Sequence, residues 1–82
     1  MNKIDVEETA PGLWRVTVGG IGVLSSNQKG VVERTARIVS EARNRPYREG
    51  IKMLIEEIGF DEDFAKEVYH EIYAHRNSHT VQ

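Results

Sequence analysis

Glycine, serine and lysine residues are concentrated in residues 17–30, TVGGIGVLSSNQKG, just before a helix-like stretch. A phosphate-binding loop needs its glycines where a strand passes directly into a helix, so that the helix N-terminus meets the phosphate. Here the apolar residues 21–24 separate the Gly19-Gly20 pair from the helix, and Lys29 precedes Gly30, the reverse of the P-loop order. The segment therefore predicts a hairpin turn and a strand rather than a nucleotide site.

Two histidines occur in the stretch HEIYAH, residues 70–75. The zinc-protease motif H-E-x-x-H needs its histidines four residues apart, about one helical turn. His70 and His75 are five residues apart, so they diverge by about 140° around a helix. His79 follows His75 by four residues but falls in the unpatterned end of the chain. We predict surface histidines, no metal site and no cofactor.

Carboxylates are dense between Glu56 and Asp63, but they do not predict acid–base catalysis. A catalytic pair needs one carboxyl group that is buried enough to shift its pKa. These side chains fall at expected helix ends, where they cap helices and offset the helix dipole. The sequence has no cysteine, and its serines show no recognisable arrangement with histidine and aspartate. We therefore expect that the protein is not an enzyme.

Charge is segregated along the chain, although the net charge is only −2. Residues 29–52 hold seven basic and three acidic side chains, whereas residues 53–71 hold seven acidic side chains and one lysine. The basic part contains ARNRPYR, residues 42–48, in which three arginines flank a proline and a tyrosine at an expected helix–helix corner. Arginine and tyrosine are enriched in interface hot spots, and arginine binds phosphate in a forked geometry.

These patterns give candidate partner-binding residues at the corner, on the helix before it and at the start of the last helix. They are Arg43, Arg45, Tyr47, Arg48, Arg34, Arg37, Glu62 and Asp63. A purely structural interpretation stays open, in which Tyr47 packs in the core and the arginines pair with acids of the last helix. A role in folding is weakly motivated for Arg45 and Arg48, because the dipole disfavours cations at the start of a helix.

Three stretches of alternating apolar residues, 3–8, 13–18 and 21–25, predict strands separated by turn pairs. Seven apolar side chains are expected to share one buried face: Ile4, Val6, Trp14, Val16, Val18, Ile21 and Val23. In the first hairpin, a three-residue loop at 10–12 pairs Ile4 with Val18 and Val6 with Val16, which keeps the apolar face intact. In the second hairpin, a two-residue loop at Gly19-Gly20 pairs Val18 with Ile21, Val16 with Val23 and Trp14 with Ser25.

Three helices are predicted over residues 27–43, 46–58 and 61–75. Ser25 and Gln28 have the spacing of a capping box for the first helix, which explains Ser25 and Ser26 better than an anion site does. The second helix begins at Pro46 and ends at Gly59 in the C′ position, with Phe60 as its hydrophobic follower. Asp61 is predicted to cap the third helix, which buries Phe64, Val68 and Ile72, with Tyr69 beside them.

The chain is therefore predicted to form one α+β domain over residues 1–75, with an unpatterned and disordered tail over 76–82. The first helix covers the apolar face of the sheet. On this prediction Leu13 and Leu24 lie on the outer sheet face, where two interpretations stay open: a homodimer or partner surface, or exposed leucines that are simply tolerated.

Small size, segregated charge and the lack of catalytic motifs favour a non-enzymatic binding protein that regulates or inhibits a larger protein assembly. The layout is common among small macromolecule-binding proteins, including accessory proteins of phages and mobile elements. The alternative is a nucleic-acid-binding protein that uses the arginine-rich segment 34–48. Neither a membrane span nor a signal peptide is evident, so we expect a cytoplasmic protein whose partner is another protein.

Overall fold

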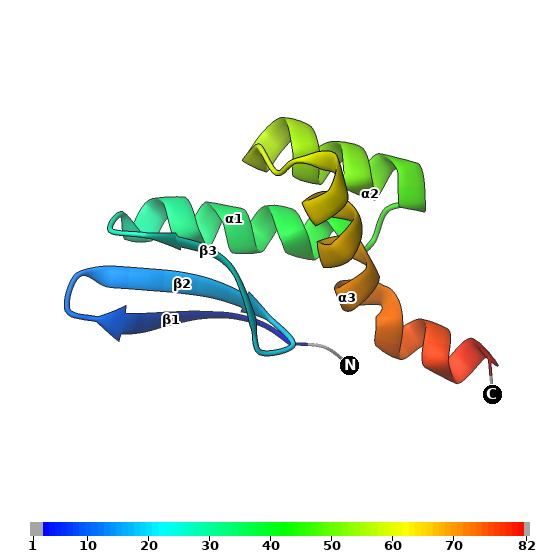
Figure 1. The fold of residues 1–82 in the computed structure, drawn as a ribbon, viewed down its shortest axis with the longest axis horizontal. Helices are drawn as coiled ribbons and strands as arrows, with labels where there is room; N and C mark the ends of the chain where they lie inside the picture. Colours follow the sequence, from blue (N-terminus) through cyan, green and yellow to red (C-terminus); the bar gives the residue numbers. More distant parts are fainter. Residues whose placement is uncertain (1–2, 82) are drawn as a thin grey trace.

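The computed structural model describes the backbone of residues 3–81 and the side chains of residues 3–72. Three strands come first, β1 (Ile4–Ala10), β2 (Leu13–Val18) and β3 (Ile21–Ser26), and form one antiparallel sheet in the order β1-β2-β3. The helices α1 (Lys29–Ala42), α2 (Tyr47–Met53) and α3 (Glu62–Val81) follow (Figure 1), and a π-helical turn η1 (Leu54–Ile58) continues α2. The predicted α+β fold, a three-stranded meander followed by three helices, is confirmed.

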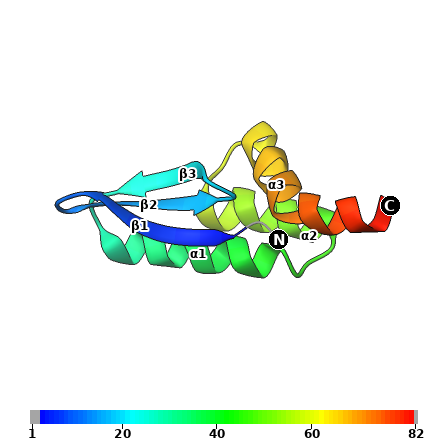
Figure 2. The same cartoon turned by 90° about the horizontal axis from the view of Figure 1, so that it is seen from below.

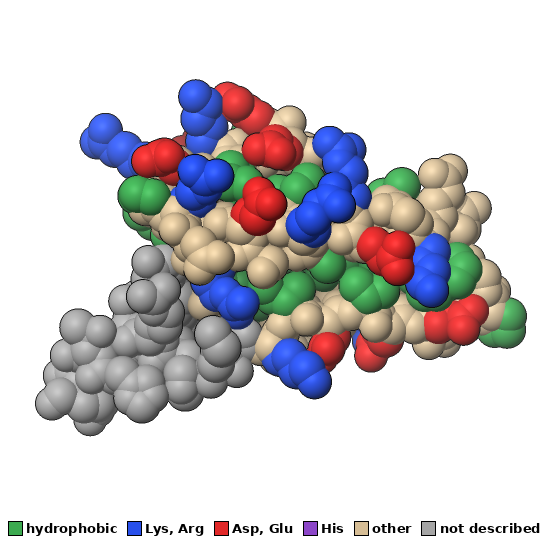
Figure 3. Space-filling model, turned by 180° about the vertical axis from the view of Figure 1, so that it is seen from behind, with side chains coloured by type: hydrophobic (Ala, Val, Ile, Leu, Met, Phe, Trp, Pro, Cys, Tyr) green, Lys and Arg blue, Asp and Glu red, His purple; other side chains and the backbone are tan. Residues whose placement is uncertain are grey.

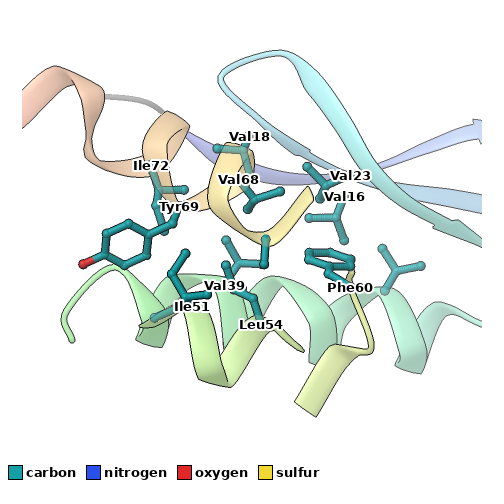
Figure 4. Close-up of a cluster of buried hydrophobic side chains, with 13 residues drawn as sticks. Val16, Val18, Val23, Val39, Ile51, Leu54, Phe60, Val68, Tyr69 and Ile72 are labelled. Carbon is teal, nitrogen blue, oxygen red and sulfur yellow. The ribbon is translucent and has the colours of Figure 1, made fainter. Parts of the chain in front are cut away.

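The helices are arranged so that α1 lies along one face of the sheet and contacts all three strands. Figure 2 shows the sheet over α1, with α2 and α3 beyond one end of the sheet. α3 contacts β2, α2 and η1, so one core continues from the sheet into the helices (Figure 4). Its buried side chains are Val16, Val18, Val23, Val32, Val39, Ala42, Ile51, Leu54, Phe60, Ala65, Val68, Tyr69 and Ile72. Val6 and Ile21, which we predicted to be buried, are 36% and 52% exposed, because both belong to edge strands.

The first hairpin has the predicted pairs Ile4 with Val18 and Val6 with Val16, but a different turn produces them. Ala10 pairs with Leu13 across a two-residue Pro11-Gly12 turn, and a bulge between Glu8 and Ala10 restores the register. Gly12 has a φ of 78°, and proline followed by such a glycine is the favoured sequence of a type II turn. The predicted three-residue loop is therefore wrong, although the strand pairs that it was meant to produce are right.

The second hairpin has the predicted Val18–Ile21 pair, but its register then shifts by one residue. A bulge at Val23 pairs Val16 with Leu24 and Trp14 with Ser26, instead of with Val23 and Ser25. Because a one-residue shift moves side chains to the other face, Leu24 packs against the core rather than on the outer face. The predicted outer surface therefore retains the 39% exposed Leu13 and loses Leu24.

The ends of the helices follow the sequence signals in part. Gly59 has a φ of 98°, and its N–H donates to the carbonyl of Ile55, as a helix end with glycine at C′ requires. The N–H of Phe64 donates to Asp61 Oδ1 at 2.7 Å, which confirms the cap of α3. The capping box at Ser25 is wrong, because Ser25 lies in β3 and the α1 cap residue Gln28 makes no side-chain cap bond.

The last helix extends to Val81, six residues beyond its predicted end at residue 75. The predicted tail 76–82 therefore includes helical backbone through Val81, while residue 82 lies outside the described residues. The side chains of His75 and His79 also lie outside them.

Gly50 tests the packing of α3 against the helices before it. A Cβ atom on Gly50 would lie 2.9 Å from the carbonyl oxygen of Ala42 and would overlap the ring of Tyr69. We predict that Gly50→Ala lowers the free energy of unfolding by about 1–3 kcal/mol in urea denaturation. The matched control Gly30→Ala, where nothing lies within 4 Å of the new carbon atom, should leave it equal or raise it by up to about 1 kcal/mol. Equal effects of the two substitutions would contradict the close packing.

Candidate functional site

The corner between α1 and α2 is held by a buried tyrosine of α3. The Tyr69 hydroxyl donates a 2.7 Å hydrogen bond to the carbonyl oxygen of Arg45. Its ring meets that of Tyr47 edge-on, with centroids 5.4 Å apart and planes at 88°, a favoured aromatic geometry. The backbone of the predicted site is therefore positioned by a residue 24 positions later in the chain.

The side chains of this corner lie mostly at the surface. Arg45, Tyr47 and Arg48 are exposed and Arg43 is half-buried. Tyr47 is 55% exposed, so the interpretation that placed it in the core is wrong. Arg45 and Arg48 belong to none of the ion pairs formed within residues 3–72, and Glu62 of α3 pairs with Lys66 of its own helix at 3.2 Å.

The remaining predicted residues form no single patch with the corner. Arg34 and Arg37 lie on the exposed face of α1, and the acidic residues Glu33 and Glu41 of the same helix are also exposed. Figure 3, which views the molecule from the side on which α1 lies, shows Lys and Arg side chains intermingled with Asp and Glu. The segregated charges of the sequence are thus not a single-sign surface on this side of the fold.

Glu62 and Asp63 lie in the first turn of α3, where acidic side chains are favoured by the helix dipole. The hydrogen bond and the negative charge of Glu62 raise the pKa of Lys66 above its usual value. These two acids therefore have a local role in α3, and the structure does not bring them into the corner's contacts.

A groove on α3 is a concave feature of the described surface that sequence reasoning missed. It has a volume of about 720 Å³ and lies between α3 and the β2–β3 hairpin. Val18, Ile21 and Val23 of the sheet face Phe64 and Val68 of α3 across it, and of the predicted site residues Tyr47 lines it. Polar side chains at its margin are Lys66, Glu67, His70 and Glu71. The alternation of β3 assigned Ile21 to the core, so the sequence pattern concealed the groove.

A smaller hollow of about 340 Å³ lies where α1 approaches α2 and η1. Its lining is mainly charged and comprises Glu41, Arg45, Glu49, Lys52, Met53, Glu56 and Glu57. Arg45 therefore projects among carboxylates, which offset its charge and weaken any positive field at the corner.

Comparisons with known proteins do not assign a function to these surfaces. No protein-family model, curated protein or solved structure matches this chain. Among the residues that the structure describes, no three His, Cys, Asp or Glu side chains are grouped to hold a metal ion. No helix in the described part of the chain has both the length and the apolar character to cross a membrane.

Tyr69 and Tyr47 offer a matched test of how the corner is held. We predict that Tyr69→Phe lowers the free energy of unfolding by about 1 kcal/mol, because the part-buried hydrogen bond to the Arg45 carbonyl is lost. Tyr47→Phe keeps the edge-on ring contact and removes a hydroxyl from an exposed side chain, so its effect should stay within roughly 0.5 kcal/mol. Thermal and urea unfolding measure both variants, and a neutral Tyr69→Phe would contradict the anchoring role of the bond.

Proposed function

We propose that the protein is a small, non-enzymatic binding protein that regulates or inhibits a larger protein assembly. The observation that carries this proposal is the 720 Å³ groove between β3 and α3, with Ile21 and Tyr47 about half exposed at it. Concave apolar surface of this kind is typical of binding sites. The sequence has no cysteine, which supports a reducing compartment, and we place this activity in the cytoplasm.

The corner adds polar contacts beside this groove. Tyr47 joins the two, since it lines the groove and is followed directly by Arg48. Apolar anchors surrounded by tyrosine and arginine form the common anatomy of protein interfaces. A protein partner accounts for both features, whereas a small ligand would need only the groove.

Nucleic-acid binding is the second candidate, favoured by the exposure of Arg34, Arg37, Arg45 and Arg48. The carboxylates among them, which Figure 3 shows on the α1 side, oppose it by repelling phosphate. If this candidate were right, affinity for a DNA or RNA duplex would fall steeply with salt concentration.

A pair of double variants distinguishes the two candidates. We predict that Arg45→Glu with Arg48→Glu leaves the melting temperature within a few degrees of wild type, equivalent to less than roughly 1 kcal/mol. Binding to the partner captured from extract of the source cells should weaken at least about tenfold, or 1.4 kcal/mol. The matched control, Lys29→Glu with Arg34→Glu, makes the same change in net charge on α1 and should leave this binding unchanged.

Three results would count against the proposal. Failure of the immobilised chain to capture any stoichiometric protein partner would overturn it. Equal weakening by both double variants, together with salt-sensitive duplex binding, would transfer the function to nucleic acid. A large drop in melting temperature for the corner variant would show that Arg45 and Arg48 serve folding instead.

A further inference from the structure

The two edges of the sheet differ in how they are protected. β1 carries Asp5, Glu7 and Glu8, and Glu7 pairs with Arg15 of β2. β3, at the opposite edge, reads IGVLSS and has neither a charge nor a proline. Charged side chains, proline and β-bulges are the means by which proteins block unwanted pairing at an edge strand. Of these three, β3 has the bulge at Val23 alone, so its edge is chemically more open to another strand than the charged edge at β1.

The backbone of β3 has pairing capacity left over. Within residues 3–81, its ladder is with β2, and none of the turn, loop and cap bonds of the backbone involves residues 21–26. In an antiparallel strand, alternate residues direct their N–H and C=O groups away from the neighbour already present. Only an extended backbone satisfies such a row of donors and acceptors in register, so the edge specifies the conformation of what binds it.

The groove supplies a side-chain site next to this edge. Ile21 and Val23 form its β3 wall, and Phe64 and Val68 form its α3 wall. A strand added to a sheet presents every second side chain to the same face. An apolar side chain of the added strand would therefore lie over the groove while its backbone pairs with β3.

Charge at the groove margin favours a particular type of side chain at the next position of the added strand that faces the groove. Lys66 is already paired with Glu62 at 3.2 Å. Glu67 is exposed at the margin. Its negative charge complements a lysine or arginine two positions from the apolar residue, on the same face of the added strand.

We propose that β3 accepts an extended segment of a partner protein as a fourth strand, with an apolar side chain in the groove and a basic side chain against Glu67. This inference rests on the proposed function and specifies how the partner is recognised. A second copy of the chain fits less well. In antiparallel pairing of β3 with itself, the polar Ser25-Ser26 end would lie opposite Ile21, and β3 offers no basic residue to Glu67.

Selection from a displayed library of random peptides, each about ten residues long, tests the inference on the full chain. We expect wild-type protein to enrich peptides in which an apolar residue and a basic residue are two positions apart, so that both face the groove. A resynthesised peptide should slow hydrogen exchange at amides of residues 21–26, and N-methylation of its backbone should weaken binding at least about tenfold. Ile21→Asp, at a half-exposed position, should abolish binding while the protein remains folded by circular dichroism.

A charge reversal makes the test specific to the groove. Glu67→Lys should change the enriched peptides from basic to acidic, whereas the matched control Glu33→Lys on exposed α1 should leave them basic. Failure to enrich any peptide, enrichment that Glu67→Lys does not alter, or binding without protection of residues 21–26 would each overturn strand addition. A shift to dimer at micromolar concentration that excludes the peptide would assign the edge to a second copy. None of these results affects the proposed function, which depends on capture of a whole partner.

Discussion

Contact between the ring of Tyr69 and the backbone at Gly50 is the constraint on which the helical half of the structure depends. A side chain at Gly50 would occupy the space of that ring, so α3 can approach α2 this closely only because residue 50 is glycine. The same tyrosine then reaches the Arg45 carbonyl and fixes the corner. The same approach of α3 to α2 positions Val68 and Ile72 in the core and forms the α3 wall of the groove.

In the sheet, two bulges determine the strand register and which side chains face the core. The bulge in the first hairpin lets a Pro-Gly turn coexist with an unbroken apolar face, and the bulge at Val23 brings Leu24 to the core side. An extra residue in one strand also increases local twist. Val23 and Leu24 both pack in or against the core. Ile21 is therefore the apolar residue of β3 that remains about half exposed at the groove.

The sequence predicts features that arise from short-range chemistry and misses those that arise from contact between distant segments. The hairpin positions, the Gly59 helix end and the Asp61 cap each depend on a few adjacent residues, and all three are confirmed. Bulges change the register without altering the alternating pattern around them, so Leu24 was misplaced. The site was predicted only in part, because the groove joins residues about 45 positions apart, while Tyr47 was found from its arginine neighbours.

If the proposed function holds, apolar burial in the groove would contribute more binding free energy than the arginines would. Exposed ion pairs contribute about 0–1 kcal/mol each, and the corner's charge is already offset by carboxylates around Arg45. Burial of one large apolar side chain contributes about 1.5–3 kcal/mol, and strand pairing would add backbone bonds in register. On this proposal, the arginines and Glu67 select the orientation and the partner. Affinity would come from burial of the exposed apolar surface of Ile21 and Phe64 beside α3, whose position depends on the contact between Tyr69 and Gly50.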